Sequence, residues 1–312
     1  MPGILARGLA AGAVGTTVLD AVGQLDVLWR GRPPGTTPQR VVDALLARAG
    51  RGAVAGNRRA ALGALGGIAT GLGVGVLASA GRSAGARFPG PAGAVLTGAV
   101  AMAAVEGPAA ALGVADPCAR DAADWAAGAV PHLAYGAAVQ GVLAAVPTAR
   151  EQRDRRTPAT AGLVLRSAVL GVATGGRSSL AVAGPVLSDP GARRPTRAVA
   201  VAAVAGELVA DKLPVTPPRT DPRSLPARLA GGVGGAGRLA AREGANAAAP
   251  VTAGLLGALA GSFGGVAWRR WAGRRVPDWQ AALAEDVVAV LLAVAACAPG
   301  GTRRPRLRLV SS

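Results

Sequence analysis

The chain has 312 residues, of which 51% are apolar and only 16% are charged, below the about 25% typical of soluble domains. Aromatic residues make up only 3%, although large aromatic side chains normally carry much of the burial energy of a water-soluble core. Helices that pack inside a membrane use small residues instead, so this composition favours a membrane protein over a soluble globular one.

The net charge of +17 comes from arginines that lie in clusters between apolar runs and near the C-terminus. Such cationic loops are typical of membrane proteins, because they follow the positive-inside rule and attract anionic headgroups. The sequence has no recognisable RNA- or DNA-binding motif and few aromatic side chains on which bases could stack. We therefore expect the partner to be a lipid bilayer with anionic headgroups, and no nucleic acid.

Apolar runs recur along the chain and predict an all-α, polytopic transmembrane bundle of about eight or nine spans. In chain order the spans are expected at residues 4–25, 60–80, 91–114, 125–146, 159–187, 198–213, 247–268 and 279–297. A ninth segment, Leu225–Arg242, has three arginines around a glycine-rich centre, and the sequence leaves open whether it crosses the membrane or is re-entrant. The orientation of the termini and the oligomeric state also stay open.

The first apolar run lacks the basic leader of a cleavable signal, so we expect it to be a retained span. After it, Thr37-Pro38-Gln39-Arg40 opens a short amphipathic helix that is expected to lie at the bilayer surface.

The run 60–80 is the most informative, because it has neither charge nor proline and repeats glycine at positions 63, 67, 71 and 75. In water each interior glycine would cost about 0.8–1.0 kcal/mol relative to alanine. In lipid the same small-xxx-small spacing lets two helix backbones touch. The spacing therefore predicts close helix packing, and glycine faces of this kind are also candidates for a homo- or hetero-oligomer contact.

A charge-dense break at residues 148–157 separates two halves of the chain. It predicts an N-terminal membrane domain over residues 1–147, with about four spans, and a linker over 148–157. A C-terminal membrane domain of four or five spans would follow over 158–298, and then a basic tail over 299–312. The halves show no convincing sequence repeat, so self-similarity does not support an inverted-repeat transporter.

Ionisable residues inside spans are candidates for function, because placing a charge at bilayer depth costs from about 2.5 kcal/mol upward. Glu207 and Asp211 are four residues apart, hence on one helical face, and Lys212 is the only lysine of the chain. Arg177 follows paired glycines in the preceding span and is expected to pair with Glu207 or Asp211. We predict a polar site made of these four residues; alternatively, Asp211 and Lys212 lie solvated at a span end.

Four weaker candidates are Glu106, His132, Tyr135 and Asp286, which lie within or at the start of other spans. His132 and Tyr135 are three residues apart and share a face, so they could relay a proton or bind a headgroup. For each candidate the alternative is a structural contact between helices.

No catalytic residue, cofactor site or metal site is expected. The chain has one histidine and two distant cysteines, and its GxGxxG match at 232–237 follows no predicted strand.

The segment Glu207-Leu208-Val209-Ala210-Asp211-Lys212-Leu213-Pro214 resembles a family of bacterial multi-pass membrane proteins. The resemblance includes the Gly-Gly-Arg-Ser of 175–178 before this segment and Arg228 with Ala230-Gly231 after it. That family is catalogued as a domain of unknown function with Gly-x-Arg-Ser and Glu-Leu-x-x-Asp-Lys-x-Pro elements. The similarity covers about residues 160–298 and lacks the His-x-x-Lys segment of the later spans. The N-terminal half, with Gly15-Thr16-Thr17 and the segment 132–136, is similar to actinobacterial multi-pass proteins. The resemblance implies a polytopic membrane fold and supplies no activity.

These patterns predict a multi-pass protein of the plasma membrane. The leading hypothesis is a carrier or channel component for a small solute or an ion, because a charge cluster between spans can form a hydrophilic site. The second is a scaffold that binds other helices and anionic lipid. The third is a membrane enzyme that acts on lipid, for which the sequence shows no nucleophile–base or metal-ligand spacing.

Overall fold

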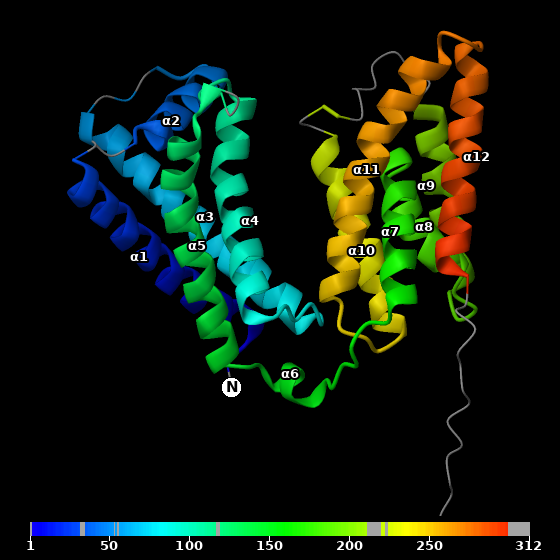
Figure 1. The fold of residues 1–312 in the computed structure, drawn as a ribbon, viewed down its shortest axis with the longest axis horizontal. Coiled ribbons are helices and arrows are strands. Elements are labelled where there is room, and N and C mark those ends of the chain that lie inside the picture. Colours follow the sequence, from blue (N-terminus) through cyan, green and yellow to red (C-terminus); the bar gives the residue numbers. More distant parts are fainter. Residues whose placement is uncertain are drawn as a thin grey trace, which may run out of the picture. The chain divides into compact units, whose positions relative to one another are not determined.

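The computed structural model describes residues 2–31, 35–52, 54, 56–116, 119–210, 220–221 and 224–298. These residues are helical or lie in connecting segments, with one isolated β-bridge between Thr157 and Ala245. The chain divides into two compact units, Met1–Arg155 and Arg156–Ser312, and the division falls inside the segment 148–157 (Figure 1).

The helices of the first unit are α1 (Ile4–Arg30), α2 (Thr37–Arg48), α3 (Gly56–Ser83), α4 (Gly90–Ala111), α5 (Ala122–Ala145) and α6 (Ala149–Arg153). Helix α1 packs against α3 and α5, while α4 packs against α5 and α2 against α3. Polar side chains start two of the helices: Asp121 accepts a hydrogen bond from Asp124 N of α5, and Thr148 accepts one from Glu151 N of α6. Such caps satisfy N–H groups that have no partner within the helix.

Glycines bring α1 and α3 into backbone contact. A Cβ atom at Gly75 would lie 2.5 Å from the carbonyl oxygen of Gly8 and 2.6 Å from the Cα atom of Gly12, so no larger residue fits without a shift. At Gly71 a Cβ atom would collide with the hydroxyl of Thr16, whereas at Gly67 it would meet open space. Two positions of the glycine series therefore face α1, and Gly67 faces away from it.

The helices of the second unit are α7 (Ala161–Gly176), α8 (Leu180–Leu187), α9 (Arg194–Ala210), α10 (Leu225–Arg242), α11 (Ala248–Ala272) and α12 (Asp278–Cys297). Helix α7 is the centre of the unit and packs against α10, α11 and α12, while α8 packs against α9 and α10 (Figure 1). Small residues again set the closest contact: a Cβ atom at Gly175 of α7 would lie 2.5 Å from the backbone nitrogen of Ser262 in α11.

The segment predicted as one span over residues 159–187 is two helices. Helix α7 ends at Gly176, Arg177 takes an extended conformation with φ −139° and ψ 107°, and α8 begins at Leu180. Sixteen residues of α-helix are about 24 Å long, shorter than the about 30 Å hydrocarbon core. The prediction of an uninterrupted span is therefore wrong here, because the paired glycines end the helix and polar side chains from other helices stabilise its open ends.

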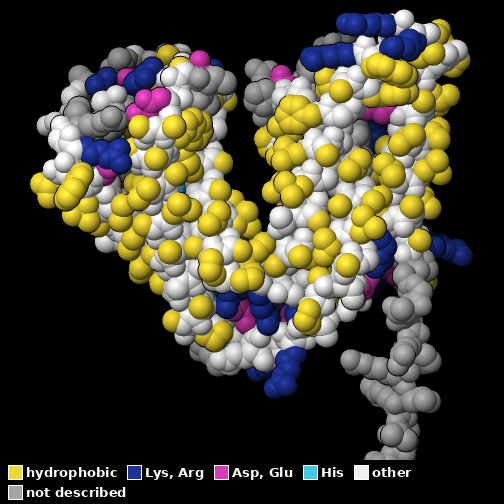
Figure 2. Space-filling view, in the orientation of Figure 1, with side chains coloured by type: hydrophobic (Ala, Val, Ile, Leu, Met, Phe, Trp, Pro, Cys, Tyr) yellow, Lys and Arg dark blue, Asp and Glu magenta, His cyan; other side chains and the backbone are white. Residues whose placement is uncertain are grey.

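Within the described part of the chain, five helices are long and apolar enough to cross a membrane: α1, α3, α4, α11 and α12. The other segments counted in the predicted eight or nine spans form shorter or less apolar helices. On the face shown in Figure 2, hydrophobic side chains cover the sides of the helices, while basic side chains gather near helix ends. These features are those of an integral membrane protein.

Candidate functional site

The break between α7 and α8 brings opposite charges to two open helix ends. Arg228 of α10 donates from Nη1 to the carbonyl oxygens of Gly175 and Gly176, at 3.0 Å each. The last carbonyl groups of a helix have no partner within it and carry partial negative charge, so a guanidinium stabilises them. The Arg228 side chain is 8% exposed, which makes it a buried cap for α7.

Glu207 of α9 binds the other side of the break. Its carboxylate accepts hydrogen bonds from the backbone N and the Oγ of Ser178, both at 2.8 Å, and from the backbone N of Ser179 at 2.7 Å. A carboxylate at these N–H groups complements the positive end of α8. Glu207 also lies 3.9 Å from Arg228 Nη2, so one ion pair joins the two caps.

Arg177, between the two helices, forms its ion pair with Asp286 of α12. Its Nε atom donates to Asp286 Oδ1 at 2.8 Å, and Nη2 bonds the same oxygen. Arg177 is buried, with 4% of the residue exposed. The break thus joins α7, α8, α9, α10 and α12 through charged side chains.

Two of the four residues of the predicted polar site lie at this break. Arg177 and Glu207 both lie at the α7–α8 break. Among the described residues, Arg177 donates to Asp286, while Glu207 accepts hydrogen bonds from Ser178 and Ser179. Asp286, only a weaker candidate, therefore supplies the carboxylate for Arg177. Asp211 and Lys212 lie outside the described residues.

Arg228 was part of the sequence resemblance but was not predicted as a residue of the site. In the sequence Arg228 is an arginine in the glycine-rich run of α10, and an arginine at this position is equally compatible with an exposed surface helix. Helix α10 buries Arg228 together with Gly232, Gly235 and Ala236 on a single face. That shared face, visible from helical periodicity, would have marked Arg228 as an inward charge.

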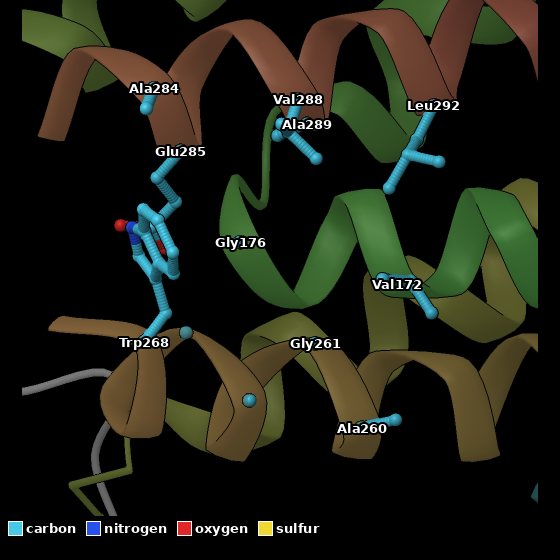
Figure 3. Close-up of a pocket in the computed structure, with 12 residues that line it drawn as sticks. Val172, Gly176, Ala260, Gly261, Trp268, Ala284, Glu285, Val288, Ala289 and Leu292 are labelled. Carbon is cyan, nitrogen blue, oxygen red and sulfur yellow. The ribbon is translucent and has the colours of Figure 1, made fainter. Parts of the chain in front are cut away.

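An apolar pocket of about 330 Å³ lies between α7, α11 and α12 (Figure 3). The indole of Trp268 and the side chain of Glu285 meet at one end of it, while Val172 and Leu292 lie at the other (Figure 3). Glycines 176, 261, 264 and 265 and several alanines leave the space between them open. Glu285 receives a hydrogen bond from Arg269 Nε at 3.2 Å.

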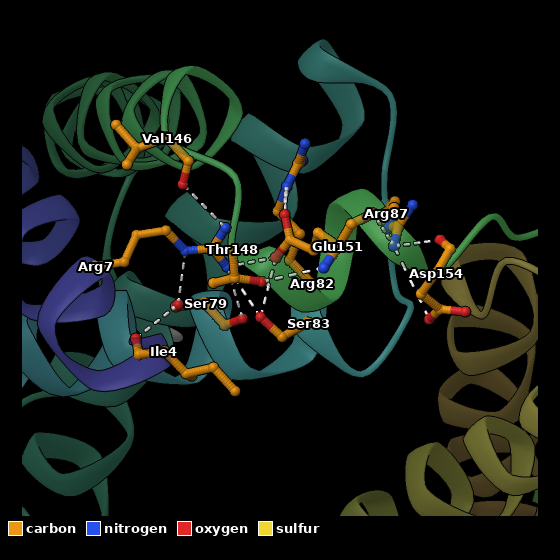
Figure 4. A network of polar contacts seen from close by, with 10 residues as sticks. All are labelled: Ile4, Arg7, Ser79, Arg82, Ser83, Arg87, Val146, Thr148, Glu151 and Asp154. Carbon is orange, nitrogen blue, oxygen red and sulfur yellow. Dashed lines mark hydrogen bonds and ion pairs between the residues drawn. The ribbon is translucent and has the colours of Figure 1, made fainter. Parts of the chain in front are cut away.

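The first unit has a separate buried polar network around Arg7 (Figure 4). Arg7 Nη2 lies 2.6 Å from Glu151 Oε1 and donates at 3.1 Å to the hydroxyl of Ser83, while its Nε atom donates at 3.1 Å to the hydroxyl of Ser79. A second arginine, Arg82, donates to Glu151 Oε2 at 3.3 Å. Glu151 lies in the segment predicted as a linker, while Arg7 and Ser79 lie in two predicted spans. None of the three was predicted as a candidate residue.

The electrostatics of Glu151 follow from these contacts. Burial by itself raises the pKa of this carboxyl, but the hydrogen bonds from Arg7 and Ser83 and the charges of Arg7 and Arg82 outweigh burial and hold the pKa below its usual value. Glu151 is thereby kept ionised and joins α6 to α1 and α3.

The remaining candidates make local contacts. Glu106 binds Arg120 at 2.8 Å. Tyr135 is fully buried and donates from its hydroxyl to the Gly71 carbonyl at 2.6 Å, and the ring of His132 bonds the Gly128 carbonyl of its own helix at 2.7 Å. His132 and Tyr135 therefore bond to different helices.

The two helix ends at the α7–α8 break bind charged groups: the carbonyl groups of α7 bind the Arg228 guanidinium, and the N–H groups before α8 bind the Glu207 carboxylate. Among the residues that the structure describes, no group of three or more His, Cys, Asp or Glu side chains is placed to hold a metal ion. Comparisons with protein-family models, with curated proteins and with solved structures find no match to this chain. The geometry of the site therefore carries the functional argument alone.

Proposed function

We propose that this chain is a multi-pass protein of the plasma membrane that carries a small solute or an ion, with its polar site at the α7–α8 break. The observation that supports this most directly is the interrupted helix itself. Its two open ends lie against Arg228 and Glu207 from other helices. Transporters commonly build substrate sites from such discontinuous helices, because the free helix ends and buried charges bind ions that lipid would exclude.

The proposal includes eight or nine crossings packed through small residues. The shorter helices α7 and α8 would then cross as a broken pair, held inside the unit by α11 and α12. Irregular backbone at membrane depth is tolerated where protein or a wet cavity surrounds it. Ser178 and Ser179 are partly exposed as residues, although the Oγ atom of Ser179 is buried, so reaction at this position would require the break to open. Thr174, one turn earlier in α7, is fully buried.

Water access to the break is the test. In a background with Cys118→Ser and Cys297→Ala, the Ser179→Cys variant is treated in sealed vesicles with a charged, membrane-impermeant thiol reagent. If the chain is a carrier whose site opens to water, Ser179→Cys should react with the reagent. Reaction both when the reagent is added outside the vesicles and when it is enclosed inside them would indicate alternating access.

The matched control is Thr174→Cys, whose thiol would lie in the dry core of α7 and should stay unmodified. If Ser179→Cys is as inert as this control from both sides, the break is a dry structural contact. The carrier proposal would then be abandoned.

A scaffold function is the second candidate, favoured by one observation on α3. Cβ atoms at Gly66, Gly67 and Gly73 would meet open space, so this face of α3 is not used in packing within the unit. A second copy or another membrane helix could approach closely there. Cross-linking in native membranes at position 66 distinguishes this proposal, because a carrier that acts as a monomer would give no cross-linked species.

A further inference from the structure

The pocket between α7, α11 and α12 combines three features of a ligand site. Its walls are almost wholly apolar, its volume of about 330 Å³ is that of a small ligand site, and one carboxylate, Glu285, lies at one end. The Glu285 side chain is only 11% exposed. A buried carboxylate in apolar surroundings strongly favours a nearby positive charge.

The aromatic ring beside this carboxylate adds a second attraction for a cation. Trp268 extends from α11 toward Glu285 of α12 (Figure 3), and its Nε1 atom donates to the carbonyl oxygen of Ala281 at 3.2 Å, which orients the ring. The indole face attracts cations that lie within about 6 Å of the ring, most strongly when the pair is desolvated. A carboxylate and an indole at one end therefore define a site for the charged part of a ligand.

The opposite end of the pocket suits hydrocarbon. Val172 of α7 and Leu292 of α12 lie there, and glycines along α11 leave room between them (Figure 3). Along α12, Glu285 and Leu292 are seven residues apart, about 10 Å. The pocket is thus polarised along its length, from an end with a carboxylate near the α11–α12 turn to an apolar end deeper in the helices.

We propose that this pocket binds a hydrophobic organic cation of the quaternary ammonium class. Its charged group would lie in the pocket beside Glu285 and Trp268, and its hydrocarbon part against Val172 and Leu292. The inference concerns binding alone and holds whether or not the chain transports a solute.

Arg269 competes with a bound cation for Glu285, although Arg269 is not among the residues that line the pocket. It bonds Glu285 through Nε at 3.2 Å, yet its side chain is 31% exposed, nearly three times the exposed fraction of Glu285. Arg269 also lies in the last turn of α11, close to the other arginines of that helix end. A long arginine side chain can move its head to the headgroup region, so a bound cation can replace it at Glu285.

The test is direct binding of benzyltrimethylammonium to the purified full chain in non-ionic detergent, measured by calorimetry. The matched control ligand is neopentylbenzene, which has the same shape with carbon in place of the charged nitrogen. The ammonium should bind, and the neutral analogue should bind at least about tenfold more weakly. Glu285→Gln should reduce the ammonium affinity about tenfold or more, whereas Arg269→Gln should increase it.

Two glycine variants separate loss of the pocket from loss of folding. Gly264 lines the pocket, and a Cβ atom there would meet open space, so Gly264→Leu should fold and should abolish binding. Gly66→Leu, on open space in α3, should leave binding unchanged. The proposal is overturned if the ammonium does not bind, if neopentylbenzene binds equally well, or if Glu285→Gln or Gly264→Leu leaves the affinity unchanged.

Discussion

Arg7 and Glu151, which are 144 residues apart in the chain, form a buried ion pair in which neither side chain is more than 4% exposed. The pair joins the start of α1 to α6, and Ser79 and Ser83 of α3 complete its hydrogen bonds. Breaking a buried pair by removing one partner typically costs about 3–5 kcal/mol, because an uncompensated charge stays behind.

We therefore expect Arg7→Met and Glu151→Gln each to destabilise the protein by several kcal/mol in detergent, measured by thermal unfolding. The double variant should lose less than the sum of the two single losses. Arg30→Gln is the control, because Arg30 pairs with Asp26 at the surface, where such a pair contributes about 0.3–0.5 kcal/mol. Simple additivity at Arg7 and Glu151 would contradict the pairing.

The depressed pKa of Glu151 predicts a pH dependence of stability. Above its ordinary value of about 4.3 this carboxyl is ionised in both states, and its contribution to stability is fully present. As the pH falls toward the lower pKa of the folded state, the unfolded chain binds the proton first and that contribution is lost. The stability difference between the wild-type chain and Glu151→Gln should thus shrink below about pH 4.3. If the stability difference between the wild-type chain and Glu151→Gln is the same from pH 7 to pH 3, the pKa of Glu151 is not lowered by folding.

Alanine at two glycines of α3 tests the contact between α1 and α3. Gly75→Ala places a methyl group against the backbone of Gly8 and Gly12, and overpacking of this kind costs about 1–3 kcal/mol. Gly67→Ala meets open space and should be neutral, or stabilising by up to about 1 kcal/mol, because alanine is the better helix former. Thermal unfolding of both variants measures the contrast, and equal effects would show that α1 does not approach α3 at Gly75.

The partner of Arg177 can be established by two double-mutant cycles. Arg177→Met combined with Asp286→Asn should show a coupling of about 1–3 kcal/mol, since the two side chains bond directly. Arg177→Met combined with Glu207→Gln should show a smaller one, because Glu207 bonds Ser178 and Ser179. A larger coupling to Glu207 would restore the pairing expected from the sequence.

Membrane integration has a simple biochemical test. The five long apolar helices predict that washing at alkaline pH with carbonate leaves the chain in the membrane pellet, as for any protein held by spanning helices. A peripheral membrane protein carried through the same procedure is the control. Recovery of the chain in the supernatant would contradict an integral protein.

The sequence was most informative about helices and least informative about which charges meet. Long apolar runs predicted α1, α3, α4, α11 and α12, because spanning length and lack of charge are local properties. The break at Arg177 was visible only as a pair of glycines, since the groups that stabilise it come from α9, α10 and α12. Local patterns do not encode such partners.

The same limit applies to the charges that sequence reasoning did select. Arg177 and Glu207 do reach one site, because both lie on inward faces near helix ends. Asp286, which pairs with Arg177, and Arg228, which pairs with Glu207, lie on helices further along the chain. Helical periodicity indicates which side of a helix faces inward, but it does not indicate which charged side chain on another helix will be the partner. Arg7 is the extreme case: its partner lies in a five-residue helix that reads as solvated linker.

The position of α6 matters for anyone who would divide this gene. An open reading frame cut after codon 147 would look natural, since it separates the two apolar halves, but the first polypeptide would keep Arg7 and lose Glu151. A cut after codon 155 lets the first polypeptide retain its own counter-ion. Co-expressed halves should therefore accumulate when split at the second point, and the N-terminal half should be degraded when split at the first.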